Sequence, residues 1–381
     1  MASADSAERR RAWAEIDLGA IRHNAAILGS LAAPAALCAV VKANGYGHGS
    51  AQAARAALDG GASSLGVALV EEGAELRREG VSAPILVLSE PPCDAMADVH
   101  ALGLTPTLYT TAAVAAAAKA VASSPDRTPM AVHVKVDTGM HRVGASPAVA
   151  VAVALAVDRC AELVLDGLWT HFALADEPAL AFTSVQDARF GDVASELDAR
   201  GVRPRLLHAS NSAGCLAHPF AHHDMVRCGI ALYGLAPSPA LVGRADLRPA
   251  LSLRARVSFV KRVDAGEGIS YGLRHRLARP SVVATVPIGY ADGVPWRLGA
   301  TGGDVLIGGR RRSIAGSVTM DQITVDCGDD PEVSPGDEVV LLGRQGDECV
   351  DAWEWARLVD TIAYEIVCRI GPRVPRTYLP G

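Results

Sequence analysis

The sequence predicts an α/β protein with an N-terminal (β/α)8 barrel of the TIM type and a C-terminal, mostly-β domain. First, eight short runs rich in Val, Leu and Ile recur at intervals of roughly 20–40 residues, with helical segments between them. Second, no G-x-G-x-x-G follows the first run, although the alternative fold, a doubly wound open sheet, usually carries one. Third, strands and turns dominate from about Pro249 onward.

The barrel is expected to use these eight runs as parallel strands, each followed by a helix. The predicted strands are Leu37–Lys42, Ser64–Leu69, Pro84–Leu88, Thr105–Tyr109, Ala131–Asp137, Val164–His171, Arg205–Ser210 and His223–Arg227. Helices are expected at Gly49–Leu58, Thr111–Ala122, Pro147–Cys160 and Leu180–Arg200. An earlier run, Trp13–Asp17, is a candidate ninth strand outside the barrel.

The domain boundary is expected in the proline-containing polar stretch Ala236–Pro249. We therefore assign residues 1–245 to the barrel and 246–381 to the mostly-β domain, with residues 1–17 as a segment that could pack on the latter. The only helix expected in the second domain is Ala352–Ala363. Its predicted strands are Leu251–Val263, Val282–Pro287, Asp304–Ile307, Gln322–Asp326 and Glu338–Leu342.

Composition excludes several classes of protein. A net charge of −6 over 381 residues argues against a nucleic-acid-binding surface, and a hydrophobic content of 50% excludes a disordered chain. None of the eight cysteines forms a C-x-x-C pair, so no metal site is expected. The polar N-terminus Met1–Arg11 lacks the apolar run of a signal peptide, and Thr111–Ala122 is too short to span a bilayer. We expect a cytoplasmic protein without a membrane partner.

Lys42 is the first candidate for chemistry. It ends the first barrel strand, and the carboxyl ends of barrel strands carry the active site. An apolar strand partly desolvates such a lysine, which favours the neutral amine that a Schiff base with pyridoxal phosphate requires. The loop Asn44–Gly49 adds three glycines, Tyr46 and a histidine, so the chain can approach a ligand closely there. A solvated loop lysine is the alternative for Lys42 taken alone.

Two further strand ends suit a phosphate group. The seventh strand runs into Asn211 and Ser212, and the eighth runs into Arg227, Gly229 and Ile230. Phosphates bind to backbone N–H groups and small hydroxyls, and in barrels they do so after the seventh and eighth strands. Each loop alone also fits an ordinary helix cap.

Ionisable residues at two more strand ends extend the candidate site. Lys135 to Arg142 follow the fifth strand, and His171 ends the sixth. Any one of them could be structural, but four such strand ends on one face indicate a site.

Taken together, these motifs resemble the alanine racemase family, whose members are fold-type III pyridoxal phosphate enzymes. The resemblance extends from Ala12 to Tyr378, and all its motifs occur in the family's order. They are Ala39–Gly49, Val136–Arg142, Gly229–Gly234, Ile269–Gly272, Ile288–Gly293, Met320–Gln322 and Tyr364–Val367.

The resemblance implies pyridoxal 5'-phosphate as cofactor and a homodimer with shared active sites. It implies that Lys42 holds the cofactor and is the base for the D-enantiomer, and that Tyr271 of the other subunit is the base for the L-enantiomer. The resemblance implies that the phosphate is bound by Tyr46, Ser212, Tyr364, Gly229 and Ile230, with Asn211 beside them. It implies that Arg227 contacts the pyridine nitrogen and is supported by His171, and that Lys135 is carbamylated. The substrate-binding residues that it implies are Arg142, Tyr290, Met320 and Asp321.

Racemisation explains why the family needs two bases. A proton must leave one face of Cα and another must return on the opposite face, while the cofactor spreads the negative charge. The expected reaction is therefore the interconversion of L- and D-alanine, which supplies D-alanine for peptidoglycan. The chain departs from the family pattern in Ser317–Asp321, where relatives often have Arg-Val-Cys-Met-Asp. Thr319 keeps a small polar group, but Ser317 lacks the charge of the arginine, so we expect a local ion pair of the relatives to be missing.

Three other functions are weighed against this one. A racemase for serine or a broader set of amino acids is the nearest, because a methyl and a hydroxymethyl group differ little for a pocket. A non-catalytic pyridoxal phosphate carrier would lack the β domain and Tyr271. A decarboxylase of the same fold type would need a cysteine setting that Cys327 and Cys349 do not resemble.

Overall fold

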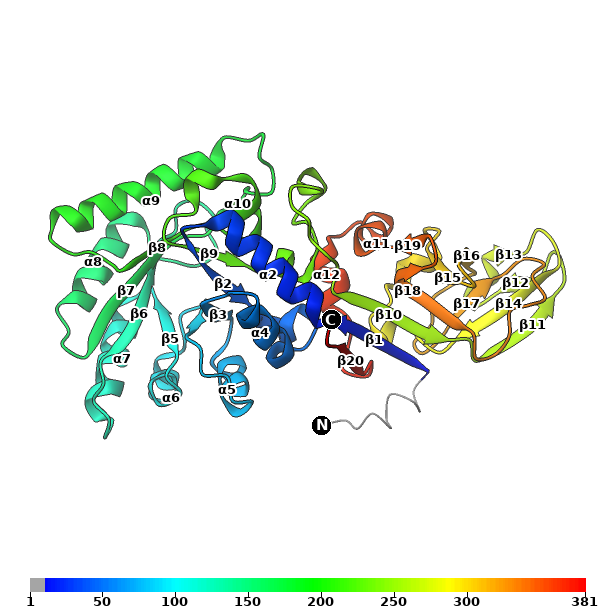
Figure 1. Ribbon diagram of the computed structural model, residues 1–381, viewed down its shortest axis with the longest axis horizontal. Coiled ribbons are helices and arrows are strands. Elements are labelled where there is room, and N and C mark those ends of the chain that lie inside the picture. The colour runs from blue at the N-terminus through cyan, green and yellow to red at the C-terminus, as the bar shows by residue number, and fades with distance from the viewer. Residues whose placement is uncertain (1–10) are drawn as a thin grey trace. The chain divides into compact units, whose positions relative to one another are not determined.

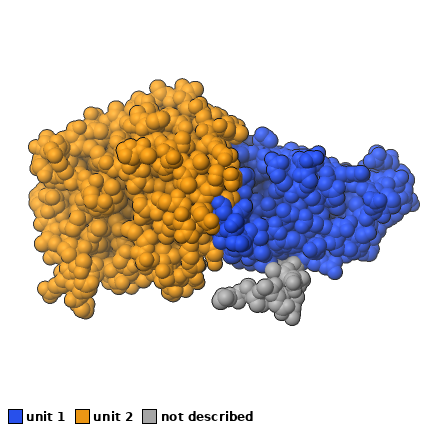
Figure 2. Space-filling model, in the orientation of Figure 1, with its two compact units in different colours: residues 1–19, 249–381 blue, residues 20–248 orange. Residues whose placement is uncertain are grey.

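The computed structural model describes residues 11–381, and the prediction for the polar N-terminus lies almost wholly outside them. The described chain divides into two compact units (Figure 2). One runs from Ala20 to Arg248; the other combines the N-terminal residues up to Gly19 with Pro249–Gly381. No helix among the described residues is long and apolar enough to cross a membrane.

Within the described residues, the first unit holds an eight-stranded parallel sheet that curls into a nearly closed barrel, in the order β8-β7-β6-β5-β4-β3-β2-β9 (Figure 1). The ladder between β2 and β9 and two further hydrogen bonds, Asp224 N–H to Leu207 O and Arg227 N–H to Ser210 O, both 2.9 Å, bring the ends of the sheet together. The strands are β2 (Ala36–Val40), β3 (Ser64–Val67), β4 (Ile85–Val87), β5 (Thr105–Leu108), β6 (Met130–Lys135), β7 (Leu163–Trp169), β8 (Leu206–His208) and β9 (Met225–Cys228).

Helices follow the barrel strands, as the alternating pattern predicts. The strands are mostly continuous apolar runs because both of their faces are covered. Local signals start several helices: the Thr110 side chain accepts from the Ala113 N–H, and Pro147 opens α8. The helices are α2 (Leu18–Ala32), α3 (Lys42–Tyr46), α4 (Ser50–Asp59), α5 (Val70–Arg78), α6 (Met96–Ala101), α7 (Thr111–Ser123), α8 (Pro147–Asp158), α9 (Phe182–Ala199) and α10 (Ser212–Ala217).

The second unit is built on a ten-stranded mixed sheet, which confirms the predicted mostly-β character for the described residues. The run Trp13–Asp17 belongs to it: β1 pairs with β10 antiparallel and with β20 in parallel. Its helices are α11 (Ala352–Val359) and α12 (Ala363–Cys368). Its strands are β1 (Ala12–Asp17), β10 (Leu251–Arg256), β11 (Phe259–Val263), β14 (Ser281–Val286), β15 (Asp304–Ile307), β16 (Arg310–Ile314), β17 (Ile323–Asp326), β18 (Glu338–Gln345), β19 (Glu348–Val350) and β20 (Arg376–Leu379), beside a hairpin of β12 (Gly268–Ile269) and β13 (His275–Arg276).

Several details of the second unit differ from the prediction, and the short strands β12, β13, β19 and β20 were not predicted. The single strand Leu251–Val263 is two strands, because the Val257 and Ser258 N–H groups bond to Asp337 and Thr285 instead of continuing one ladder. The expected helix Ala352–Ala363 breaks at Asp360, which adopts a left-handed φ of 62°. Strand β16 was missed because three consecutive arginines hide its alternation; in the structure, the partly buried Asp304 and Glu348 pair with Arg311.

Candidate active site

The carboxyl end of β2 carries Lys42 in an unusual turn. Lys42 is half-buried and follows the buried Val41. The next four residues have positive φ angles of 52°, 52°, 61° and 52°, and only one of them is glycine. A left-handed conformation costs a non-glycine residue roughly 1–2 kcal/mol. The fold therefore holds strained backbone beside the lysine, as is common where a side chain must be aimed.

Tyr46, Ser212 and Gly229 converge on one small region. The Ser212 hydroxyl oxygen accepts hydrogen bonds from the Gly229 N–H at 2.9 Å and the Ala231 N–H at 3.3 Å. A Cβ atom on Gly229 would lie 2.3 Å from the Tyr46 hydroxyl oxygen, so only glycine leaves room there. Hydroxyls and backbone N–H groups of a loop are the donors that a phosphate requires.

Asn211 and Ile230 lie at the edges of this region. The Asn211 side-chain oxygen accepts from the Gly214 N–H at 3.0 Å and so caps α10. Ile230 is buried and opens the short 3-10 turn Ile230–Tyr233 after β9. The cap and the turn fix the two loops that the sequence analysis selected.

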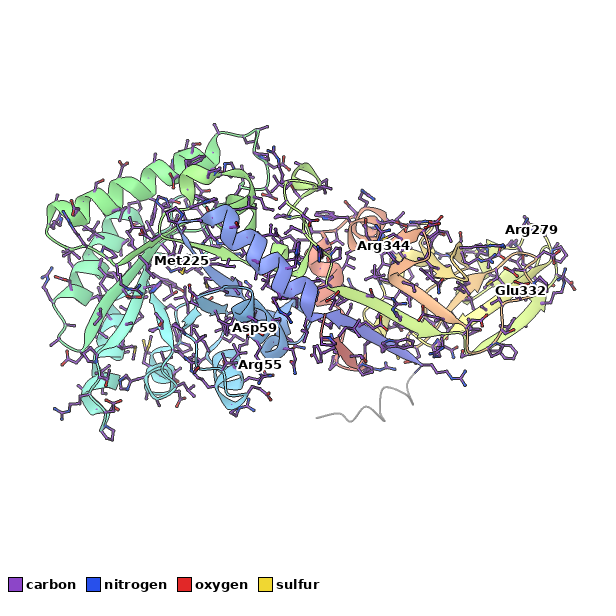
Figure 3. All side chains as sticks on the ribbon, in the orientation of Figure 1. Arg55, Asp59, Met225, Arg279, Glu332 and Arg344 are labelled. Atoms are coloured by element: carbon purple, nitrogen blue, oxygen red, sulfur yellow. The ribbon has the colours of Figure 1, made fainter. Side chains whose placement is uncertain are left out.

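Arg227 lies inside the barrel on β9, two residues after Met225, which is labelled in Figure 3. Its guanidinium donates to the carbonyls of Thr170 and Ala209, both at 2.9 Å, and it lies 3.4 Å from His171 Nδ1. Burial lowers the pKa of Arg227 to about 10, so the group remains a cation at neutral pH.

The remaining barrel candidates are close enough to influence one another electrostatically. Burial, followed by the charges of Arg227 and Arg142, lowers the pKa of Lys135 to about 7. Burial and the charge of Arg227 lower the pKa of His171 well below its ordinary value. Lys135 is almost fully buried, with Nζ 4.2 Å from the centre of the Trp169 ring, whereas Arg142 is exposed. The barrel thus brings a lysine whose amine loses its proton near neutral pH close to the guanidinium groups of Arg227 and Arg142.

The other predicted residues belong to the second unit. Tyr271 is 77% exposed, Met320 53% and Tyr290 41%. Tyr364 lies in α12 and is half-buried. Asp321 forms an ion pair with Arg373 at 2.7 Å.

Ser317 has a role that the sequence did not indicate. Its hydroxyl donates to the Tyr271 carbonyl at 3.3 Å, and the Ser270 hydroxyl donates to the Ser317 carbonyl at 2.8 Å. Thr319 closes its own turn by donating to the Gln322 carbonyl at 2.8 Å. Two serine hydroxyls therefore secure the turn that carries Tyr271.

Sequence reasoning missed several side chains that line the barrel. Strand register sets Lys135, Trp169 and His208 side by side across β6, β7 and β8. His133 lies two residues before Lys135, and alternate residues of a strand point to the same face. The alternation of side chains along the strand would therefore have placed His133 on the same face as Lys135.

A second cavity, of about 440 Å³, lies in the β unit, with Arg279 and Glu332 in its lining (Figure 3). Two of its arginines are engaged with a carboxylate: Arg312 and Arg310 both pair with Asp330. No cluster of His, Cys, Asp or Glu among the described residues could hold a metal ion. The barrel site is therefore the stronger candidate.

Comparisons with known proteins point to one family. Residues 16–237 match the model of the alanine racemase N-terminal domain, and residues 250–378 match that of the C-terminal domain. The alanine racemase of Symbiobacterium thermophilum is 48% identical over 97% of both chains.

Solved structures show the same similarity. The crystal structure of alanine racemase from D-cycloserine-producing Streptomyces lavendulae superposes with a TM-score of 0.91 at 40% identity over 98% of both chains. A histidine racemase from Leuconostoc mesenteroides has a TM-score of 0.89 at 29% identity, covering 97% of this chain and 98% of its own. The chain belongs to the alanine racemase family.

Proposed function

We propose that the protein interconverts L-alanine and D-alanine with pyridoxal 5'-phosphate at the carboxyl end of the barrel. The observation that carries the proposal is the meeting of Tyr46, Ser212 and Gly229 in the same barrel whose first strand leads into Lys42. The matched family models and relatives named alanine racemase support alanine as substrate.

The side chains of the barrel fit this cofactor. The Tyr46 and Ser212 hydroxyls and the backbone N–H groups of Gly229 and Ile230 would hold the phosphate, and the cap formed by Asn211 would keep that loop in place. The resemblance adds Tyr364 to the phosphate ligands. Lys42 would hold the cofactor covalently. When bound, pyridoxal phosphate supplies a delocalised system that accepts the electron pair left on Cα.

Arg227 would face the pyridine nitrogen, with His171 beside it. A guanidinium with a pKa near 10 donates hydrogen bonds and does not give up its proton at neutral pH. The pyridine nitrogen would then stay unprotonated, which limits electron withdrawal and disfavours side reactions such as transamination.

Two bases would serve the two faces of the substrate. Lys42 would remove the Cα proton of D-alanine, and Tyr271 of the partner subunit would remove that of L-alanine. Each base would return a proton to the face that the other has left. Arg142 would bind the substrate carboxylate, while the partner subunit's Tyr290, Met320 and Asp321 would border the substrate.

Lys135 is proposed as a site of carbamylation. Its buried amine has a pKa of about 7, so a large share of it is neutral at neutral pH, and the neutral amine is the form that attacks CO₂. The amine nitrogen bonds to carbon, one proton is released, and the product is an anion. That anion would offset the charges of Arg142 and Arg227, both of which lower the pKa of Lys135.

A cytoplasmic homodimer that makes D-alanine for peptidoglycan is the setting we propose. The β unit exposes large side chains, with Tyr271 at 77%, Leu273 at 55% and Trp296 at 55%. Exposed aromatic and aliphatic residues of this kind are typical of a surface that a partner covers. A second copy of the chain would cover it and share the active site.

Chiral chromatography tests the proposed reaction. The protein is loaded with pyridoxal phosphate and incubated separately with L-alanine, D-alanine, L-serine and L-histidine; histidine is included because one structural relative is a histidine racemase. We expect both alanine enantiomers to reach the same equal mixture, faster than serine or histidine reacts. Faster conversion of serine or histidine would show that this amino acid, and not alanine, is the preferred substrate. No conversion by the loaded protein would contradict the proposal.

A further inference from the structure

Four side chains from four neighbouring strands form a continuous line inside the barrel. Arg227 Nη1 lies 2.9 Å from His208 Nδ1, His208 Nε2 lies 2.9 Å from His133 Nδ1, and His133 Nε2 lies 3.3 Å from Asp166 Oδ2. The two histidines and Arg227 are at most 4% exposed. At the outer end, Arg205 binds both oxygens of Asp166, at 2.7 Å and 2.9 Å.

Two features of β7 make room for this line. The pairing of β6 with β7 shifts by one residue between Val132 and His133, so that Asp166 faces no partner in the ladder. Such bulges turn a side chain in a new direction. The next residue is Gly167, and a Cβ there would lie 2.5 Å from His133 Nδ1. The absence of a side chain at Gly167 gives the His133 ring its space.

Both ends of the line fix the positions of its protons. A guanidinium only donates hydrogen bonds, so His208 Nδ1 must accept and a neutral His208 carries its proton on Nε2. That proton is donated to His133 Nδ1, which leaves the His133 proton on Nε2. A carboxylate only accepts, so Asp166 completes the same direction.

The surroundings keep both rings neutral. Burial lowers the pKa of His133 and that of His208, and the charge of Arg227 acts in the same direction on both. His223 further lowers the pKa of His208, while Asp166 opposes the shift at His133 and Arg205 adds to it. Arg227 forms no direct ion pair among the described residues. The hydrogen-bonded line through His208 and His133 connects it to a carboxylate, that of Asp166.

We propose that Asp166 is a positioning residue that, through His133 and His208, fixes the proton arrangement of the line and the orientation of the Arg227 guanidinium. The functional part of this inference rests on the proposed function, in which Arg227 faces the pyridine nitrogen. Without the carboxylate, the His133 Nε2–H loses its acceptor and the direction of the line rests on Arg227 alone, so the tautomers mix whenever the guanidinium moves away from His208.

The direct test is nitrogen-15 NMR of histidine-labelled protein without cofactor, because the two ring nitrogens report the tautomer. Signals are assigned with His133→Gln. We expect His133 and His208 each to carry a single proton on Nε2 at neutral pH. In the wild-type protein, a proton on His208 Nδ1, or a doubly protonated ring of His133 or His208, would by itself overturn the proposal.

The variant Asp166→Asn replaces the carboxylate with a neutral amide of nearly the same shape. We expect mixed tautomers at His133 and His208, a cofactor absorption spectrum whose pH dependence is shifted, and a kcat for alanine reduced at least about tenfold. The matched control is Asp198→Asn, since Asp198 pairs with Arg203 in the same unit but outside the line. This control should leave all three readouts at wild-type values.

The outcomes separate the two proposals. Predicted tautomers in a protein that racemises nothing would reject the proposed function and retain the proton arrangement. Unchanged tautomers and an unchanged cofactor spectrum in Asp166→Asn would reject the role of Asp166, whatever the activity.

Discussion

Gly229→Ala is the substitution whose effect the structure specifies most closely. The added Cβ would lie 2.3 Å from the Tyr46 hydroxyl oxygen and 2.8 Å from its Cζ. Ordinary contact begins at 3.4 Å, so the hydroxyl must retreat by about 1.1 Å. The φ of Gly229 is −108°, so no left-handed backbone opposes alanine, and the clash is with the Tyr46 side chain.

The expected cost is one hydrogen bond to the proposed phosphate. A hydrogen bond to a charged group contributes about 1.5–3 kcal/mol, which corresponds to cofactor binding that is roughly 10- to 150-fold weaker. The assay is titration of the cofactor-free protein with pyridoxal phosphate, followed by absorbance. Thermal unfolding of the cofactor-free variant checks that the barrel is intact. Gly191→Ala is the control, because nothing lies within 4 Å of a Cβ at that helical position.

A double-mutant cycle makes the reasoning refutable. Tyr46→Phe removes both the hydrogen bond and the nearest clashing atom and leaves the Cζ contact at 2.8 Å, so Gly229→Ala should cost less in that background. The same cost in both backgrounds, or cofactor affinity within about twofold of wild type for Gly229→Ala alone, would show that Tyr46 and Gly229 do not share a phosphate site.

Three further predictions concern the bases, Lys135 and the Tyr271 turn. Lys42→Ala and Tyr271→Phe should each abolish most racemase activity, and mixed subunits should regain part of it; verified heterodimers with no activity would exclude a shared site. In CO₂-free buffer Lys135 is neutral in the folded chain above about pH 7, whereas its ordinary pKa is 10.5. Unfolding then takes up a proton, so the free energy of unfolding should rise with pH by up to ~1.4 kcal/mol per unit in that range, and denaturant titrations should find this slope absent in Lys135→Met. Ser317→Ala removes the hydrogen bond to the Tyr271 carbonyl and should lower kcat for L-alanine severalfold with little change in thermal stability; an unchanged kcat would mean that this bond does not hold the Tyr271 turn.

Local patterns predict the barrel well. Each of its strands is a short apolar run between helical segments, and the polar residues that follow the runs lie where the barrel places its strand ends. Lys42, Ser212 and Gly229 could be selected for this reason, because their proposed roles depend on the element that each one follows.

What the sequence could not show depends on register. The contact between His133 and Asp166 requires a one-residue shift between β6 and β7, and no local pattern announces such a bulge. The bond from Ser317 to the Tyr271 carbonyl joins residues 46 positions apart. Strand β16 was missed for a related reason: its arginines read as a polar loop until partners such as Asp304, Glu348 and Asp330 are brought beside them.

The most direct test of the central claim is to follow the Cα hydrogen of L-alanine in D₂O. The reaction of the cofactor-loaded protein is stopped early, and the alanine enantiomers are separated and analysed by mass spectrometry. Two bases on opposite faces predict D-alanine with one solvent deuteron at Cα from the first turnovers, because Lys42 returns a proton that did not come from the substrate. D-Alanine that keeps the original hydrogen, or no D-alanine at all, would contradict the account.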